Sequence, residues 1–272
     1  MIGRAGAAIV LGIVVAFLAV PLVALFVQAP LGSLPSLLRE QVVRDAIWVT
    51  IKTNLAANAL VLGFGTPAAW ALATRRFPGR TLILTLCELP LVLPPAVAGI
   101  ALLSAYAQGG LFGDALDSIG VVLPFGPWAV ILAVAFVASP FYLRQAVATF
   151  EAVDGDLTDV ARTLGASRTA TFWRVVLPLA AGGLVAGWVL AFARGVGEFG
   201  ATIIFAGNVQ GKTTTLTLAV YQELDSNLDI ALALGVVLVA LSAGVLLSYK
   251  LLGAWRSSIS TSPAGFATSR LT

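Results

Sequence analysis

The sequence contains no histidine, a single cysteine and few charged residues. Charged side chains make up 11% of the 272 residues, whereas soluble domains carry about 25%. Without histidine, the chain lacks the usual general base and the usual zinc ligand, and a Ser-His-Asp triad is excluded. Cys87 alone cannot form an internal disulfide or a cysteine metal cluster, and its apolar neighbours indicate a small core residue. We therefore expect no catalytic residue, no metal site and no cofactor.

What the chain has in excess is apolar surface. Hydrophobic residues make up 59% of the sequence, and a soluble fold of this size could not bury them all, so much of this surface must face a lipid bilayer. The net charge of +3 comes without any run of Lys or Arg, because the positive charges lie between apolar blocks. A nucleic-acid partner is therefore not expected.

Six apolar segments are long enough to cross a bilayer at about 20 residues each. They cover residues 7–27, 47–73, 83–106, 128–148, 179–206 and 229–252. Arg4 and the first segment resemble a signal peptide, but the apolar run is longer than a signal peptide's core, which favours a first membrane helix. The third segment contains Pro90, Pro94 and Pro95, which we expect to bend or break it near its cytoplasmic end.

The distribution of Lys and Arg predicts the orientation. With the N-terminus inside, the cytoplasmic segments hold Arg4, Arg75, Arg76, Arg80, Arg144, Arg162, Arg168, Arg174, Lys250, Arg256 and Arg270. The outer segments hold only Arg39, Arg44, Lys52 and Lys212. This bias predicts cytoplasmic termini and an even number of spans. The chain thus reads as an all-α membrane protein with one polytopic domain over 1–252 and a disordered cytoplasmic tail over 253–272.

The predicted cytoplasmic loop at 149–178 contains an amphipathic helix. Four apolar residues recur at the i, i+3, i+4 and i+7 spacing of one helix face; they are Leu157, Val160, Ala161 and Leu164. Asp156 is placed to cap this helix, and Gly165 to end it. Ser167 then begins a second helix that runs through Pro178 into the fifth span. By its periodicity the first helix could lie on the membrane surface or dock into a groove of another protein.

The same loop resembles the EAA loop of ABC importer permeases, whose pattern is E-A-A-x3-G-x9-I-x-L-P. The corresponding residues here are Asp159, Val160, Ala161, Gly165, Val175, Leu177 and Pro178. The departures, Asp for Glu, Val for Ala and Val for Ile, keep the charge or apolar character, and the spacing is intact. In that family the loop is the coupling helix that docks onto the ATP-hydrolysing subunit. The resemblance implies this role for Leu157, Asp159, Val160, Ala161, Leu164, Gly165 and Pro178.

Other stretches resemble the molybdate and sulfate branch of these permeases. They are RRFPGR at 75–80, LPLVLPPAVAGIALL at 89–103, GEFGATIIFAGN at 197–208 and GKTTTLTLAVYQEL at 211–224, of which the last two are most similar to molybdate permeases. The resemblance implies a non-catalytic subunit of the bacterial cytoplasmic membrane. Its implied partners are a second copy of the chain, two ATP-binding cassette ATPase subunits and an extracytoplasmic substrate-binding protein. Tungstate, sulfate or thiosulfate import and secondary anion transport remain alternatives.

The fifth segment carries a ladder of small residues and one charged pair. Gly183, Gly187, Ala191 and Gly195 recur every fourth residue, which permits close helix packing in lipid. Arg194 and Glu198 are four residues apart and are predicted to face the same way. They could form a structural ion pair or touch an anion in a translocation pathway.

One motif resembles a phosphate-binding loop. Residues 206–213 read AGNVQGKT, a relaxed form of that pattern, in which Lys212 would meet a nucleotide. The pattern requires a preceding strand, whereas a membrane span precedes it here, on the predicted outer side. We expect this loop to meet the external binding protein instead.

Overall fold

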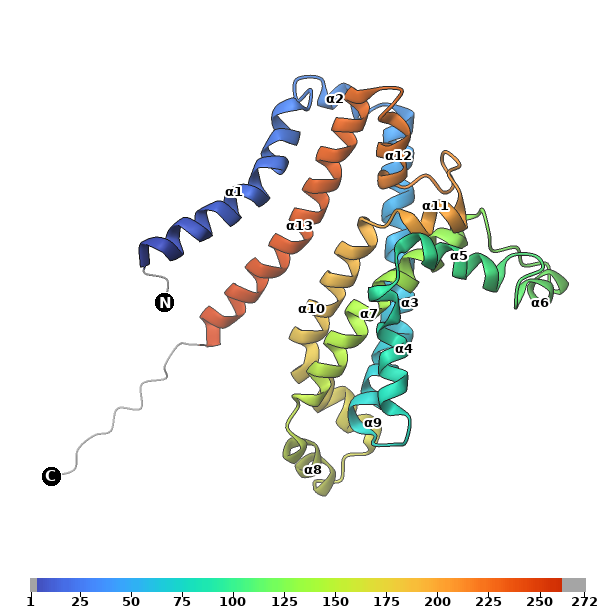
Figure 1. Ribbon diagram of the computed structural model, residues 1–272. Coiled ribbons are helices and arrows are strands. Elements are labelled where there is room, and N and C mark those ends of the chain that lie inside the picture. The colour runs from blue at the N-terminus through green and yellow to red at the C-terminus, as the bar shows by residue number, and fades with distance from the viewer. Residues whose placement is uncertain (1–3, 261–272) are drawn as a thin grey trace.

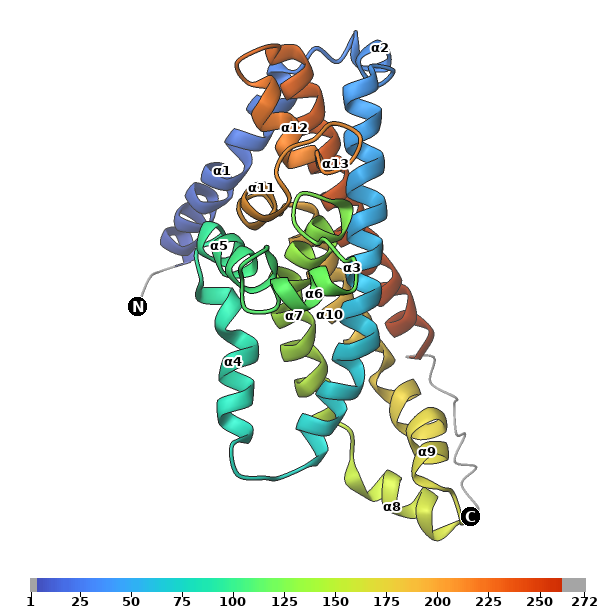
Figure 2. The same ribbon diagram turned by 90° about the vertical axis from the view of Figure 1, so that its right-hand side faces the viewer.

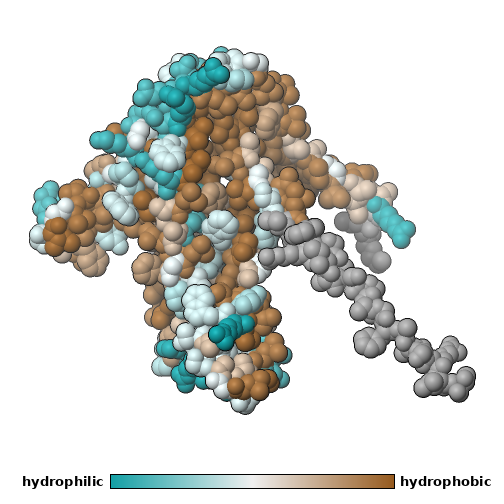
Figure 3. Space-filling view, turned by 180° about the vertical axis from the view of Figure 1, so that it is seen from behind, coloured by the Kyte–Doolittle hydropathy of each residue, from teal (hydrophilic) through white to brown (hydrophobic). Residues whose placement is uncertain are grey.

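The computed structural model describes residues 4–260, with side chains to residue 251, and this part of the chain is helical apart from turns and loops (Figure 1). Five helical stretches are long and apolar enough to cross a membrane: α1 (Arg4–Gln28), α3 (Gln41–Thr74), α7 (Pro127–Glu151), the continuous stretch Arg168–Val196, and α13 (Leu228–Ser260). A bent pair, α4 (Arg80–Val92) and α5 (Pro95–Tyr106), makes a sixth if it is counted as one span. This agrees with the predicted all-α membrane protein. Figure 3 shows the corresponding apolar surface between more polar ends.

The core lies where α3, α7 and α10 (Leu177–Val196) pack side by side. Small residues on α10 set how closely the helices approach, as the glycine ladder predicts. A methyl group at Gly195 would lie 2.4 Å from the Asn54 side chain of α3, and one at Gly183 would lie 2.2 Å from Thr149 of α7. Ala191 between them is fully buried. The ladder is therefore a packing surface inside this subunit.

The third predicted span is broken in its middle. Helix α4 ends at Val92, and α5 leaves it at an angle of 118°. The prediction placed this break near the cytoplasmic end, which is wrong: the 13 residues of α4 extend about 20 Å before the bend. The reason is that Pro90 is accommodated inside α4, whereas Pro94 and Pro95 together end the helix.

The fifth predicted span, 179–206, is also broken. Helix α10 ends at Val196, and after a short turn a separate helix, α11 (Gly200–Ala206), runs in another direction. Figures 1 and 2 show α11 beside α5, both crossing the bundle. Glycines permit this contact, because a methyl group at Gly99 would lie 2.8 Å from Ile204, and one at Gly200 would lie 2.7 Å from Pro95. The two broken spans thus pack through their second halves.

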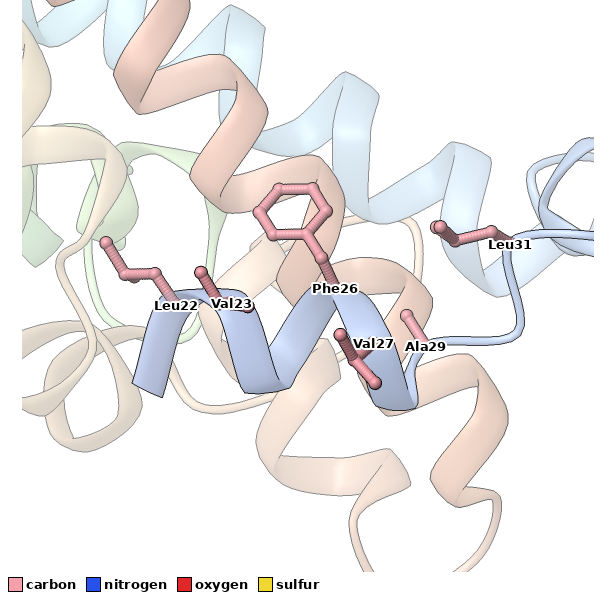
Figure 4. A pocket seen from close by; sticks show the side chains of 6 residues that line it. All are labelled: Leu22, Val23, Phe26, Val27, Ala29 and Leu31. Carbon is pink, nitrogen blue, oxygen red and sulfur yellow. The ribbon is translucent and has the colours of Figure 1, made fainter. Parts of the chain in front are cut away.

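Helix α1 is nearly detached from this core. None of its residues is buried, and it diverges from α13 toward its N-terminal end (Figure 1). The two helices meet near Leu25 and Gly235. There the last turns of α1 form a shallow apolar hollow (Figure 4), lined by Leu22, Val23, Phe26, Val27, Ala29 and Leu31.

The remaining helices connect these spans. They are α2 (Leu34–Leu37), α6 (Gly113–Ser118), α8 (Gly155–Thr163), α9 (Arg168–Thr171), a π-helical turn (Phe172–Val176) and α12 (Leu216–Glu223). Helix α13 continues to Ser260, so residues 253–260 are helical rather than disordered as predicted. The rest of the predicted tail, 261–272, lies outside the described residues.

Candidate functional site

Helix α8 lies at one end of the molecule, away from the bundle core (Figures 1 and 2). Its N-terminus is capped by Asp154, whose Oδ1 accepts a hydrogen bond from the Asp156 backbone N–H at 3.0 Å. The prediction assigned the cap to Asp156, which is wrong because the helix begins at Gly155, and Asp156 lies in its first turn. There its charge favourably meets the positive end of the helix dipole.

Gly165 ends this helix in the way predicted. Its φ angle is +88°, a conformation that favours glycine. The Gly165 N–H donates to the Arg162 carbonyl, and the Ala166 N–H donates to the Ala161 carbonyl, each at 3.0 Å. These two bonds make a Schellman motif, which satisfies carbonyl groups that the helix end would leave free. Gly165 therefore sets the direction in which the chain leaves α8.

The apolar stripe of α8 is uncovered. Leu157, Val160 and Leu164 are 47%, 56% and 82% exposed, and Ala161 is half-buried. Asp159, on the same helix, is also exposed. Apolar side chains gathered on a short polar loop are typical of a surface that another molecule covers.

The loop is joined rigidly to the bundle on its other side. Ser167 caps α9, because its Oγ accepts from the Ala170 N–H at 3.2 Å. The chain then passes through a π-helical turn, in which the Leu177 N–H donates to the Phe172 carbonyl. Pro178, which has no N–H and would clash with a carbonyl in a regular turn, explains this wide turn. Ser167 and Pro178 thus lead directly into α10, as predicted.

Three aromatic side chains anchor this turn, and the sequence did not reveal them. Trp70 of α3 lies 5.3 Å from Phe150 of α7 and 5.4 Å from Phe172 of the π turn, measured between ring centroids. Phe150 and Phe172 are 6.3 Å apart. Residues so distant in sequence have no periodic pattern in common, so only the fold brings them together. These contacts therefore connect the chain that leaves the α8 loop to α3 and α7.

The second candidate site is the Arg194–Glu198 pair at the break between α10 and α11. Arg194 Nη1 lies 2.8 Å from Glu198 Oε2, and the Glu198 side chain is 1% exposed. Glu198 Oε1 accepts a hydrogen bond from the Ala201 N–H at 2.8 Å, and the Glu198 carbonyl accepts one from Thr217 Oγ1 at 2.6 Å. Glu198 thus joins α10, α11 and α12. Its contacts favour the structural interpretation over direct contact with a transported anion.

Buried amides extend this polar centre across α3. Asn54 donates from Nδ2 to the Phe192 carbonyl of α10 at 3.1 Å, and Asn58 donates to Asn54 Oδ1 at 2.8 Å. The two side chains are 1% and 2% exposed. They fix the helix pair at the level where Gly195 gives the closest approach.

Removing the charge of Glu198 is expected to destabilise the fold. Breaking a buried ion pair costs about 3–5 kcal/mol. Because the Arg194 side chain is 28% exposed, we expect a loss at the lower end of this range. Thermal unfolding in detergent should show a clear drop in Tm for Glu198→Gln. As a control, Glu151→Gln removes an exposed partner of Arg80 and should change stability by less than about 1 kcal/mol. An unchanged Tm with impaired anion transport would instead indicate a pathway role for Glu198.

The stretch that resembles a phosphate-binding loop does not fold as one. Helix α11, rather than a strand, precedes it. The N–H groups of Lys212, Thr213 and Thr214 all point to the Val209 carbonyl, at 3.0, 2.9 and 3.2 Å. Because these donors are used within the turn, they form no open cradle for phosphate oxygens. Among the side chains of residues 4–251, no cluster of metal-ligating groups occurs either.

Comparison with known proteins places these features in a family. Residues 63–257 match the family described as binding-protein-dependent transport system inner membrane component. The molybdenum transport system permease protein ModB of Mycobacterium tuberculosis is 41% identical over 235 residues, covering 86% of this chain and 88% of the relative. The sulfate transport system permease protein CysT of Synechococcus elongatus is 35% identical over 242 residues, covering 88% and 87%.

The fold is also found among solved structures. A bacterial ABC transporter involved in the import of the acidic polysaccharide alginate contains a chain with a TM-score of 0.67 to this one. The sequences are 17% identical, and the alignment covers 90% of this chain and 93% of that chain. At this identity the likeness establishes the common arrangement of helices.

Proposed function

Because the chain belongs to the family of binding-protein-dependent transport system inner membrane components, we propose that it is the membrane-spanning permease of an ATP-driven importer for molybdate. It forms the translocation pathway with a second copy of itself. An extracytoplasmic binding protein delivers the anion, and separate ATPase subunits supply the energy. The permease itself carries out no chemical reaction.

The observation that carries this proposal is the uncovered stripe of α8. It presents Leu157, Val160 and Leu164 to solvent, and Gly165 and Asp154 fix both ends of the helix. A groove in an ATPase subunit is the proposed cover. When the ATPase subunits close, α8 would move with them, and the aromatic anchor at Trp70, Phe150 and Phe172 would transmit that motion to the bundle.

The proposed orientation places α8 and both termini in the cytoplasm. The bias of Lys and Arg toward the segments on that side supports it. The 207–215 loop then lies outside, where a binding protein could reach it. Its turn is held by internal hydrogen bonds, including that from Thr214 Oγ1 to Asn208 Oδ1 at 2.6 Å.

Disrupting the stripe is expected to abolish binding of the ATPase. Val160→Asp combined with Leu164→Asp places two charges on the apolar contact. Truncation of a central interface residue typically costs about 2 kcal/mol or more. This energy corresponds to a loss of about 30-fold in affinity. Co-purification of the ATPase with the tagged permease measures this loss. Thr163→Asp, on the same helix but outside the stripe, is the matched control and should retain the ATPase. Equal retention by both variants would contradict docking through α8.

Molybdate is proposed before sulfate because the molybdenum permease relative is the more similar of the two, at 41% against 35% identity. Sulfate is the second candidate, since its relative covers 88% of the chain, against 86% for the molybdenum permease. Competition in a reconstituted uptake assay separates them. Unlabelled molybdate should suppress labelled molybdate uptake at concentrations where sulfate does not, and the reverse ranking would make sulfate the substrate.

A further inference from the structure

A second pair of opposite charges lies within the membrane-spanning helices, between Arg144 of α7 and Glu88 of α4. Cys87 and Leu89 flank Glu88, whereas Arg144 follows Leu143 and precedes Gln145. Arg80 and Glu151 form an ion pair that marks the α8 end of the same two helices. At 1.5 Å per residue, Glu88 and Arg144 lie about 12 and 10 Å further along. The pair therefore lies about two turns in from the α8 end of both helices.

This pair differs from Arg194–Glu198 in the exposure of its side chains and in the distance between its charged groups. The Arg144 and Glu88 side chains are 72% and 46% exposed, whereas those of Arg194 and Glu198 are 28% and 1% exposed. Arg144 Nε lies 3.8 Å from Glu88 Oε1, which is beyond hydrogen-bond distance. Arg144 donates no hydrogen bond to any residue between 4 and 251, so its planar fork of donors is available to a ligand.

An exposed charge at this depth requires a polar environment. Charged side chains in membrane helices rarely face lipid and usually face a water-filled cavity or each other. Arginine binds tetrahedral oxyanions through two parallel N–H groups, and the bond is strengthened by charge. A nearby carboxylate limits the affinity, which suits a site that an anion must leave again.

We propose that Arg144 binds the divalent oxyanion transiently on the cytoplasmic half of its route, with Glu88 as the counter-ion of Arg144 when no anion is bound. This rests on the proposed function for the identity of the anion. The anion takes the place of Glu88 beside the guanidinium and is released as Glu88 returns. A phosphate headgroup of the lipid has the same chemistry and is the competing occupant that the experiments below separate.

Water access to position 144 tests the proposal without requiring transport. The assembled transporter carrying Cys87→Ser and Arg144→Cys is placed in vesicles and treated with a membrane-impermeant, negatively charged thiol reagent. We expect position 144 to react, because a pathway residue is reached through water. Leu18→Cys in the same Cys87→Ser background is the control for lipid contact and should stay unmodified, because Leu18 is 61% exposed on an apolar helix. An unreactive position 144 would overturn the proposal.

Two charge-neutralising variants then separate a role in anion passage from a structural role. Arg144→Gln should slow ATP-driven molybdate uptake at least tenfold, and Glu88→Gln should also slow it, because no carboxylate returns to displace the anion. Glu151→Gln, which removes the exposed partner of Arg80 instead, should leave uptake within about twofold. Equal losses of uptake and of Tm in both Arg144→Gln and Glu88→Gln would mean a purely structural pair.

If the defect of Arg144→Gln occurred only in vesicles containing anionic lipid, the ligand would be a headgroup. If the wild type imported no anion while position 144 still reacted, the proposed substrate would fail and the water-filled route would remain.

Discussion

Replacing Gly165 by valine is expected to weaken coupling about tenfold or more while leaving the membrane bundle folded. Gly165 has a φ of +88°, and a residue with a Cβ pays about 1–2 kcal/mol in the left-handed region, more when it is β-branched. This energy lowers the ratio of molecules in which α8 ends at residue 165 to those in which it does not by roughly 5–30-fold. Without this helix ending, the apolar stripe of α8 would no longer point in its docking direction. Stimulation of the ATPase by the permease and uptake should therefore both fall about tenfold or more.

Gly155→Val is the matched control for this change. Gly155 also lies at an end of α8, and like Gly165 it has open space where a Cβ would project, but its φ is not positive. The control should therefore retain most of the coupling, whereas Gly165→Val should not. Similar activity in the two variants would mean that the ending of α8 does not set its docking geometry.

The second large effect is expected at Gly195, where α10 approaches α3 most closely. A valine there would place its Cβ 2.4 Å from Asn54 Oδ1 and 2.8 Å from Val134 Cγ1. Both neighbours are buried, and Asn54 is held by its hydrogen bond to the Phe192 carbonyl. Such overpacking typically costs 1–3 kcal/mol, occasionally more. Gly195→Val should therefore lower both Tm in detergent and the yield of folded protein.

Gly182→Val tests whether this loss comes from packing or from glycine replacement alone. Gly182 lies on the same helix with no atom within 4 Å of its would-be Cβ, so its replacement should leave Tm almost unchanged or raise it slightly. Equal destabilisation by both variants would contradict the close approach of α10 and α3 at Gly195.

The parts of the fold that follow from local pattern could be predicted from the sequence. The length of the apolar segments predicted the membrane helices, and the spacing of Leu157, Val160 and Leu164 predicted α8 and its apolar face. Gly165 was correctly expected at the helix end, because a positive φ has a strong residue preference. Small residues at every fourth position likewise predicted the packing face of α10.

The errors arose where two local preferences competed or where distant residues meet. Asp154 and Asp156 are both suitable caps, and only the backbone path before α8 decides between them. The turn after Val196 interrupts an apolar segment because Glu198 binds the first turn of α11 and Thr217 binds the Glu198 carbonyl. Those contacts join parts of the chain that no sequence period connects. The aromatic anchor of Trp70, Phe150 and Phe172 escaped prediction for the same reason.

Uptake of radiolabelled molybdate into proteoliposomes containing this chain, its ATPase and its binding protein tests the central claim most directly. We expect uptake that requires ATP and the binding protein and that falls about tenfold or more with Gly165→Val. A secondary transporter would instead follow an imposed proton or sodium gradient and ignore ATP. Uptake that depends on such a gradient, with no effect of ATP or of the Gly165 change, would contradict the account.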